Sequence, residues 1–237
     1  MAIIITSEQT IPIDEPFKVS AGPGAGKTHW LISHIKNVVS NSNKLDVVKK
    51  VACITYTNVG TDTITSRLDI GNDVVEVCTI HSFLYANVVK PYIHLVSKDF
   101  GLKLDDLVVI DDSNFKSEGT AAIVLKRIGK SWLDAKIYLK GLTKAMWRYE
   151  NHEYKHYKPN YPQTYELKSG KRYVGNDWYM EFKRWLWSGG YMSFDDILYF
   201  SYILLSRYSN IFKLIKARYP YICLLYTSPS PRDTERS

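Results

Sequence analysis

The chain has 237 residues, of which 45% are hydrophobic and 23% are charged, and its formal net charge is +7. This composition excludes a wholly disordered chain, a collagen-like fibre and a disulfide-stapled miniprotein, and the length suits one or two domains with a conventional core. The basic excess and the 18 tyrosines are compatible with a polyanionic partner without requiring one.

The cysteine pattern and the apolar runs bear on location. Cys53, Cys78 and Cys223 are far apart and have no histidine at metal-ligand spacing, which predicts a reducing compartment and no zinc site. The first residues lack the basic start and long apolar stretch of a secretory signal. No apolar run approaches the roughly 20 residues that a membrane helix needs. We therefore expect a cytoplasmic protein that does not engage a membrane.

The first third of the chain alternates between strand-like and helix-like patterns. Residues 17–20 predict a short strand that ends at a glycine-rich turn, and apolar side chains at helical spacing predict a helix over residues 28–39. Residues 50–57 and 74–80 are rich in β-forming residues, and each run precedes a predicted helix. The alternation predicts an α/β fold, with a parallel sheet flanked by helices.

The middle of the chain has a different pattern. Residues 104–190 show helical periods and no clear buried strand, which predicts a mainly helical inserted subdomain. We expect the first part of the α/β domain over residues 1–98, the insertion over 99–190, and a return to the α/β domain over 191–222. Basic and aromatic side chains interleave through residues 147–187, and they form either a second DNA platform or a small helical core with a solvated basic surface.

Two adjacent carboxylates, Asp195 and Asp196, follow Ser193 at the start of a predicted helix. Such a pair can supply metal ligands or a general acid and base. Ser193 and Asp196 also have the spacing of a helix cap, where the helix dipole favours acidic groups. Both interpretations stay open at this point.

The last segment, residues 223–237, is expected to be a non-native or disordered tail. Residues 223–233 back-translate without mismatch to a DNA sequence that resembles a transposon-end adapter used in preparing sequencing libraries. The alternative is a natural tail rich in serine and proline.

Residues 21–28, Ala-Gly-Pro-Gly-Ala-Gly-Lys-Thr, match the Walker A pattern except that alanine stands first. Glycines permit the backbone conformations in which successive N–H groups turn toward phosphate oxygens, and the start of the next helix adds partial positive charge. We expect Lys27 and Thr28 to be catalytic, with Lys27 on the β- and γ-phosphates and the Thr28 hydroxyl on Mg²⁺. The nucleotide-binding set is Gly22, Gly24, Ala25, Gly26, Lys27, Thr28 and His29. The alternative is a glycine-rich turn with a chance Lys-Thr pair.

Four later segments carry a family resemblance. Residues 51–58 resemble motif Ia of the UvrD/Rep-like superfamily 1A helicases, and residues 77–83 resemble the next motif, with Ile80 in place of an aromatic residue. Residues 192–198 resemble the Phe-Asp-Asp-Leu segment that precedes motif II, and residues 218–222 resemble the lead-in to that motif. The segments occur in the order found in the family.

The resemblance implies a RecA-like P-loop NTPase domain with a helical insertion, in a motor that uses ATP and Mg²⁺ to move along single-stranded or partly duplex DNA. It implies a role in DNA repair, recombination, replication restart or defence against foreign DNA. It does not identify a protein partner that would load the motor onto DNA. By motif, the expected nucleic-acid-binding residues are Thr55, Tyr56, Thr57, Asn58, His81 and Ser82. An aromatic at the end of a core strand can stack on a base of any identity, and short polar groups suit phosphates and sugars. The alternatives are a core role for Tyr56 and a helix-capping role for His81.

The sequence departs from the family after Ile222. The resemblance implies an Asp-Glu pair there, which supports Mg²⁺ and orients the attacking water, but this chain continues with Cys-Leu-Leu-Tyr. A second RecA-like domain is also expected and does not follow. We therefore expect the parent protein to be an ATP-dependent helicase, and this chain to lack hydrolytic activity. For the adenine-contacting glutamine of the family, Gln9 is the only candidate before the glycine-rich loop.

Two other function classes remain at this stage. One is a regulatory P-loop module that binds nucleotide without moving along DNA, and the other is a small-molecule kinase. The segments at residues 77–83 and 192–198 favour the helicase over both.

Overall fold

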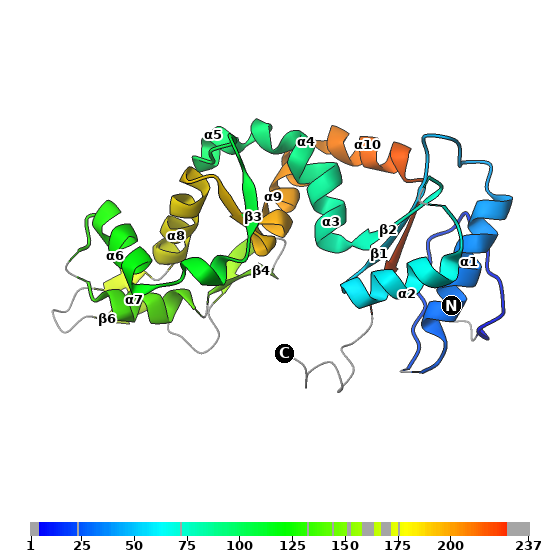
Figure 1. Cartoon of the computed structure of the whole chain (residues 1–237), viewed down its shortest axis with the longest axis horizontal. Coiled ribbons are helices and arrows are strands. Elements are labelled where there is room, and N and C mark those ends of the chain that lie inside the picture. Colours follow the sequence, from blue (N-terminus) through cyan, green and yellow to red (C-terminus); the bar gives the residue numbers. More distant parts are fainter. Residues whose placement is uncertain are drawn as a thin grey trace. The chain divides into compact units, whose positions relative to one another are not determined.

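The structure is a computed structural model, and it describes residues 5–22, 24–71, 73–131, 133–143, 145–150, 153–157, 164–166, 172–174 and 176–226. The chain forms two compact units (Figure 1). Unit 1 comprises Met1–Phe83 and Ser209–Ser237, and unit 2 comprises Leu84–Tyr208. Among the helices in these described ranges, none is long and apolar enough to cross a membrane.

Unit 1 contains a three-stranded parallel sheet, as the sequence predicted. Its strands are β1 (Val51–Thr55), β2 (Val75–Thr79) and β9 (Tyr221–Leu225), in the order β2-β1-β9. Every residue of the central strand β1 is buried. A strand paired on both sides and covered on both faces is expected to be a continuous apolar run, and Val-Ala-Cys-Ile-Thr fits.

The helices of unit 1 are α1 (Lys27–Asn41), α2 (Asn58–Leu68), α3 (Ile80–Leu84), which reaches the boundary with unit 2, and α10 (Ser209–Arg218). α1 and α2 lie beside the sheet in Figure 1, and both contribute to its core. The apolar residues of α1 recur every three to four positions, which gives the helix one core-facing stripe. The core residues of unit 1 are Leu31, Ile32, Ile35, Val38, Val51, Cys53, Ile64, Leu68 and Val75.

One predicted strand of unit 1 is wrong. Residues 17–20 form no strand and have no place in the sheet. The run has only four residues and follows a proline, so it offers few ladder hydrogen bonds. Its aromatic ring, Phe17, lies edge-on to Trp30 and His34 of α1, with ring centroids 5.6 and 4.9 Å apart, so the segment packs on the helix instead.

Unit 2 is mainly helical, but it contains short strands that the sequence did not predict. β3 (Val108–Ile110) pairs in parallel with β8 (Tyr191–Ser193), β4 (Met146–Glu150) pairs antiparallel with β5 (Glu153–Tyr157), and β6 (Thr164–Glu166) pairs antiparallel with β7 (Arg172–Val174). Its helical elements are η1 (Tyr85–Val89, a π-helix), α4 (Lys90–Tyr92), η2 (Ile93–Leu95), α5 (Ser97–Phe100), η3 (Asp112–Phe115), α6 (Glu118–Arg127), α7 (Ala135–Leu142), α8 (Asn176–Ser188) and α9 (Phe194–Arg207).

The boundaries of unit 2 also differ from the expected 99–190. α9 packs against η1 and η2, the Arg207 guanidinium pairs with Asp99 at 2.6 Å, and the Tyr208 hydroxyl donates to the Leu95 carbonyl at 3.3 Å. Residues 84–98 and 191–208 therefore pack as part of the insertion. The sequence placed them in the α/β domain because their own pattern contains no break there.

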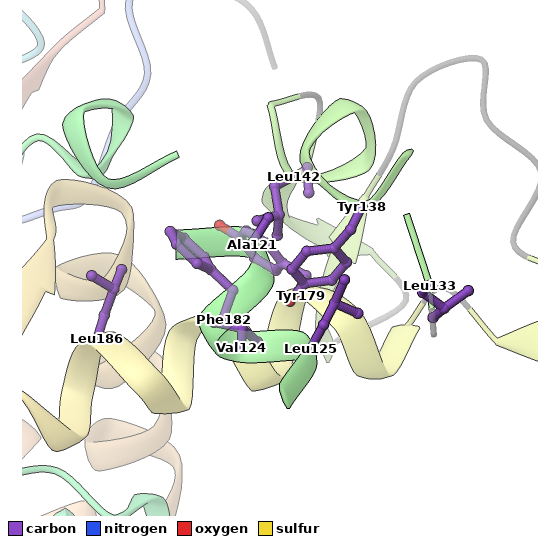
Figure 2. Packing of buried hydrophobic residues seen from close by; sticks show 10 residues of the cluster. Ala121, Val124, Leu125, Leu133, Tyr138, Leu142, Tyr179, Phe182 and Leu186 are labelled. Carbon is purple, nitrogen blue, oxygen red and sulfur yellow. The ribbon is translucent and has the colours of Figure 1, made fainter. Parts of the chain in front are cut away.

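The core of unit 2 lies where α6, α7 and α8 meet (Figure 2). Apolar and aromatic side chains from the three helices interdigitate there, which matches one of the two interpretations of residues 147–187, a small helical core. The buried members are Ala121, Val124, Leu125, Leu133, Tyr138, Leu142, Ala145, Tyr179, Phe182 and Leu186.

A buried polar network explains the carboxylate Asp196. Its Oδ2 accepts from the Ser193 backbone N–H at 2.9 Å while the Ser193 hydroxyl accepts from the Asp196 N–H, which is a capping box at the start of α9. The same carboxylate pairs with Lys183 at 3.0 Å and accepts from the indole N–H groups of Trp147 and Trp187. Asp196 is therefore a structural cap, while Asp195 lies exposed in the first turn.

Residues 223–226 are the described part of the segment that was expected to be a tail, and most of them belong to a strand. Residues 223–225 complete β9 and pair with β1, with Cys53 opposite Cys223 and Thr55 opposite Leu225. The rest of the segment lies outside the described residues.

Candidate nucleotide and nucleic-acid site

The carboxyl end of the sheet brings two predicted DNA-binding segments together. Thr55, the last residue of β1, is opposite Thr79, the last residue of β2. Residues 55–58 and 81–82 therefore follow the ends of neighbouring parallel strands. In open parallel sheets this edge is the usual place for ligands, because the loops that leave the strands converge there.

The start of α1 faces the same edge. Ser42, directly after α1, donates its hydroxyl hydrogen to the Tyr221 hydroxyl at 2.9 Å, and Tyr221 is the first residue of β9. The end of α1 thus lies at the amino end of the strands. Because a helix of this length spans roughly 22 Å, its first residue lies toward the carboxyl end. The glycine-rich loop therefore belongs to the same edge as the ends of β1 and β2.

The glycine-rich loop has the backbone conformation that the sequence predicted. Gly24 and Gly26 have φ angles of 76° and 77°, in the left-handed region that residues with a Cβ rarely adopt. The Ala25 N–H donates to the Gly22 carbonyl at 3.3 Å, which closes the turn. Within the described residues, the N–H groups of Gly24, Gly26, Lys27 and Thr28 have no protein acceptor. They are free to bind an anion where α1 begins.

The Lys27 ammonium lies over this loop. Its Nζ donates to the carbonyl oxygens of Ala21 and Gly22, at 2.5 and 3.2 Å. These acceptors are neutral, so they hold the side chain in place without cancelling its charge. Thr28 is half-buried beside it, and His29 is exposed. The loop thus combines a cation with free amides, which is the donor set that phosphate requires.

A segment that precedes the loop packs against its helix. The indole N–H of Trp30 donates to the Gln9 carbonyl at 2.9 Å, and a Cβ on Gly26 would lie 3.4 Å from the Ser7 Cβ. Gln9 therefore lies near the first turn of α1. This contact could not be predicted from the sequence, because the helical spacing places Trp30 in the apolar stripe of the helix but does not identify its partner.

Tyr56 is not a core aromatic. Its side chain is 63% exposed, although the preceding residue, Thr55, is buried. The Thr55 hydroxyl donates to the Thr57 carbonyl at 2.9 Å and shares a hydrogen bond with the Thr61 hydroxyl. The Thr57 hydroxyl accepts from the Gly60 N–H and caps α2. Both threonines thus shape the turn that presents the Tyr56 ring, and Asn58 is exposed next to it.

At the end of β2, the cap is provided by a residue that sequence reasoning missed. The Thr79 hydroxyl accepts from the Ser82 N–H at 3.3 Å and hydrogen-bonds with the Ser82 hydroxyl at 3.0 Å. His81 is half-buried, and Ser82 is exposed. A threonine that ends a strand and begins a helix is a common cap, so the sequence Thr-Ile-His-Ser contained the signal.

The segment where the family resemblance implies an Asp-Glu pair has a different composition. Residues 221–226, at the end of β9, contain no carboxylate. In the part of the chain that the structure describes, no three His, Cys, Asp or Glu side chains form a group that could hold a metal ion. Burial raises the pKa of Cys53 to about 12 and that of Cys78 to about 11, so these strand thiols stay protonated and are poor nucleophiles.

Comparison with known proteins decides the family. The sequence model of the UvrD/REP helicase N-terminal domain matches residues 6–224, which is most of the chain. The chain belongs to this family. The parallel sheet, the loop before α1 and the inserted unit 2 agree with a UvrD-type helicase domain. Membership in this family supports a helicase-type ATP-binding role for the chain. Nucleic acid is the substrate class that the family implies.

A curated relative shares part of this UvrD-type domain. The Gabija protein GajB of Bacillus cereus (strain HuB5-5) is 41% identical over 76 residues, which cover 31% of this chain and 11% of GajB. The chain thus matches about a tenth of the length of that relative.

Proposed function

We propose that this chain is the ATP-binding part of a UvrD-type motor that couples ATP hydrolysis to movement along single-stranded DNA in the cytoplasm. The observation that carries the proposal is the bend before α1, where the N–H groups of Gly24, Gly26, Lys27 and Thr28 have no acceptor among the described residues, in a chain that matches the UvrD family over residues 6–224. The pathways that fit are DNA repair, recombination, replication restart and defence against foreign DNA.

The nucleotide half of the proposal assigns a task to each loop residue. The N–H groups of Gly24, Gly26, Lys27 and Thr28 bind phosphate oxygens. Lys27 exchanges its two carbonyl partners for the β- and γ-phosphates. Mg²⁺, when bound with ATP, neutralises phosphate charge, and the Thr28 hydroxyl is its ligand from this chain. Gln9 lies near Trp30, within reach of the first turn of α1, and we assign it to the adenine base.

The 237-residue chain is proposed to bind ATP without turning it over. Hydrolysis requires a carboxylate to orient the attacking water, and the end of β9 supplies none. Steady release of phosphate by the purified chain, stimulated by single-stranded DNA, would refute this part of the proposal.

The DNA half of the proposal rests on Tyr56. Its ring is exposed at the edge that also holds Asn58, His81 and Ser82. Because every base has a π-face, one exposed ring can bind successive bases without reading sequence, which suits a translocating motor. The short polar side chains around it suit contacts with phosphate and sugar.

Replacing Tyr56 by alanine tests the DNA half. Stacking on one base contributes about 1–3 kcal/mol, so Tyr56→Ala should weaken binding of a fluorescent oligothymidine by roughly 5- to 150-fold in an anisotropy titration. Phe212→Ala is the matched control, because Phe212 of α10 is 59% exposed in the same unit and has no assigned role. If the unsubstituted chain and Tyr56→Ala bound the oligothymidine with equal affinity, Tyr56 would not be part of the DNA-binding site.

A further inference from the structure

The segment that carries Gln9 is held by side chains rather than by secondary structure. Residues 5–17, which we call the strap, contain no helix or strand, and they lead to the glycine-rich loop. The Gln9 N–H donates to the Thr6 carbonyl at 3.3 Å, which closes a turn within the strap. That bond shapes the strap but does not attach it to the rest of unit 1. The place of Gln9 therefore depends on what the strap contacts.

One contact reaches Gln9 itself. The indole N–H of Trp30, in the first turn of α1, donates to the Gln9 backbone carbonyl at 2.9 Å. Because the acceptor is a backbone atom, this bond does not engage the Gln9 side chain, which is exposed. The bond thus fixes where the residue lies while its side-chain amide stays available to a ligand.

The donor of this bond has a fixed direction. Trp30 is 6% exposed, and its ring stacks on His34 with an interplanar angle of 8°. Phe17 of the strap lies edge-on to the same indole, at 5.6 Å between centroids. These two rings hold the plane of the indole and therefore the direction of its N–H. A buried N–H without an acceptor is unfavourable, so the strap is held against Trp30 before any nucleotide binds.

The other anchors of the strap lie further along the chain. Ile13 packs against the core of unit 1, and Asp14 accepts from Lys44 at 2.6 Å and from the Tyr221 hydroxyl at 3.4 Å. The Lys44 and Asp14 side chains are 49% and 65% exposed, and an exposed ion pair adds little stability. Since no helix or strand connects these anchors to Gln9, they do not fix its position. That task falls to Trp30.

A glutamine held in place can distinguish adenine from guanine. Its amide offers a donor and an acceptor, which match the N7 acceptor and the N6 amino donor of adenine. Guanine has two acceptors, N7 and O6, at the same edge, so the glutamine oxygen would face O6 without a hydrogen between them. This discrimination depends on geometry, because an amide that is free to shift or turn can make one hydrogen bond with either base.

We propose that Trp30 is a positioning residue that makes the nucleotide site select adenine over guanine. The inference rests on the proposed function, which assigns Gln9 to the base, and it adds a task for a residue outside the glycine-rich loop. Trp30 acts through the Gln9 backbone rather than by contact with the base. The phosphates are bound by the loop, so the inference concerns the choice of base.

The test compares ATP with GTP. Unlabelled ATP or GTP, each with Mg²⁺, displaces a fluorescent ATP analogue from the 237-residue chain, and the ratio of the two dissociation constants is measured. The parent should bind ATP roughly 5- to 150-fold more tightly than GTP, which is the discrimination of a bidentate amide–adenine pair. Trp30→Phe keeps an aromatic ring but removes the N–H. Its ratio should be roughly 2- to 12-fold smaller, mainly through weaker ATP binding.

Two further variants separate positioning from stability. Trp185→Phe removes an indole N–H from a half-buried tryptophan of unit 2, and it should keep the parent ratio. Phe17→Leu keeps the Trp30 N–H but loosens the indole, so it should lower the ratio by less than Trp30→Phe does. Because Phe17 is 47% exposed, this variant should fold, and it decides the inference if Trp30→Phe does not fold.

The inference is overturned if Trp30→Phe weakens ATP and GTP by the same factor or leaves both unchanged, since a merely structural role does not alter the ratio. If Trp30→Phe does not fold, an unchanged ratio in Phe17→Leu overturns it. Gln9→Ala separates these failures from failure of the proposed function. A ratio that is lost in Gln9→Ala but kept in Trp30→Phe overturns only the task of Trp30. Equal ratios in the parent and Gln9→Ala would also remove Gln9 from the adenine site.

Discussion

His34 is a buried residue on the apolar face of α1. Its ring is 5% exposed and stacks on Trp30, with centroids 5.0 Å apart, and Phe17 lies edge-on to it. Its Nδ1 has no hydrogen-bond partner among the described residues. Burial lowers the pKa of His34 below its usual value, because the charged ring would lose its hydration.

This burial predicts a loss of stability in acid. The unfolded chain binds a proton at His34 near pH 6.5 while the folded chain still resists it, so the stability contributed above that pH is lost as the pH falls below it. Urea unfolding at pH 7.5 and 5.5 should show a smaller decrease for His34→Phe than for the parent, by up to about 1.4 kcal/mol. His94→Gln, at an exposed histidine, should behave like the parent. An unchanged pH dependence in His34→Phe would contradict this account.

Lys27 and Tyr56 illustrate how far single residues could be predicted. The sequence predicted a left-handed bend before Lys27, because three glycines alternate with other residues there, and the structure confirms it at Gly24 and Gly26. The exposure of Tyr56 could not be predicted, since a tyrosine after a buried strand can point either way. The contacts of Trp30 with Gln9 and of Thr79 with Ser82 were missed, because they depend on how segments fold back on each other.

At the scale of elements, the sequence pattern predicted two strands of unit 1 but missed the strands of unit 2. The strands β1 and β2 were predicted because both runs are rich in β-forming residues, and each is followed by a helical pattern. The segment at residues 17–20 was wrongly predicted as a strand, since four residues after a proline gain more from packing Phe17 on α1. In unit 2, the strand β4 was missed because its stability comes from tertiary contacts such as Trp147 stacked on Tyr199, at 4.1 Å between centroids.

The start of α9 shows a similar dependence on tertiary contacts. The capping spacing of Ser193 and Asp196 was visible in the sequence, but the partners Lys183, Trp147 and Trp187 were not. Lys183 is fully buried, and it also bonds Asp112 at 2.7 Å and the Ser193 hydroxyl at 2.7 Å. Burial acts to raise the pKa of Asp112, but its charge interactions and hydrogen bonds with Lys183 and Lys116 together lower that pKa below its usual value. Five elements, η3, β4, β8, α8 and α9, thus meet at the buried charges of Lys183 and Asp196.

Removing one charge of this network should destabilise unit 2 strongly. Asp196→Asn leaves the buried Lys183 with one carboxylate partner fewer, which typically costs about 3–5 kcal/mol. Asp195→Asn is the control, since Asp195 is exposed one position earlier in the same helix, and it should cost less than about 1 kcal/mol. Urea unfolding followed by tryptophan fluorescence measures both. Equal losses would show that the network does not stabilise the fold as described.

At the scale of the whole molecule, the sequence predicted the class of fold and its interruption by an insertion, but not where the insertion begins and ends. The units divide at residues 83/84 and 208/209 because α9 packs against η1 and η2. The order of apolar and polar residues along the chain does not contain this information. The glycine-rich loop, by contrast, is local in the sequence. Its bend could be predicted because glycine permits the positive φ angles that Gly24 and Gly26 adopt, and its role in nucleotide binding stays a prediction.

The most direct test of the account is the binding of a fluorescent ATP analogue with Mg²⁺ to the 237-residue chain. We predict saturable binding by the parent, and at least roughly tenfold weaker binding by Lys27→Ala, because a charge-assisted contact to phosphate contributes about 1.5–3 kcal/mol. Lys36→Ala, on the exposed face of the same helix, should bind like the parent. Equal affinities of the parent and Lys27→Ala would contradict the claim that the loop before α1 holds the triphosphate.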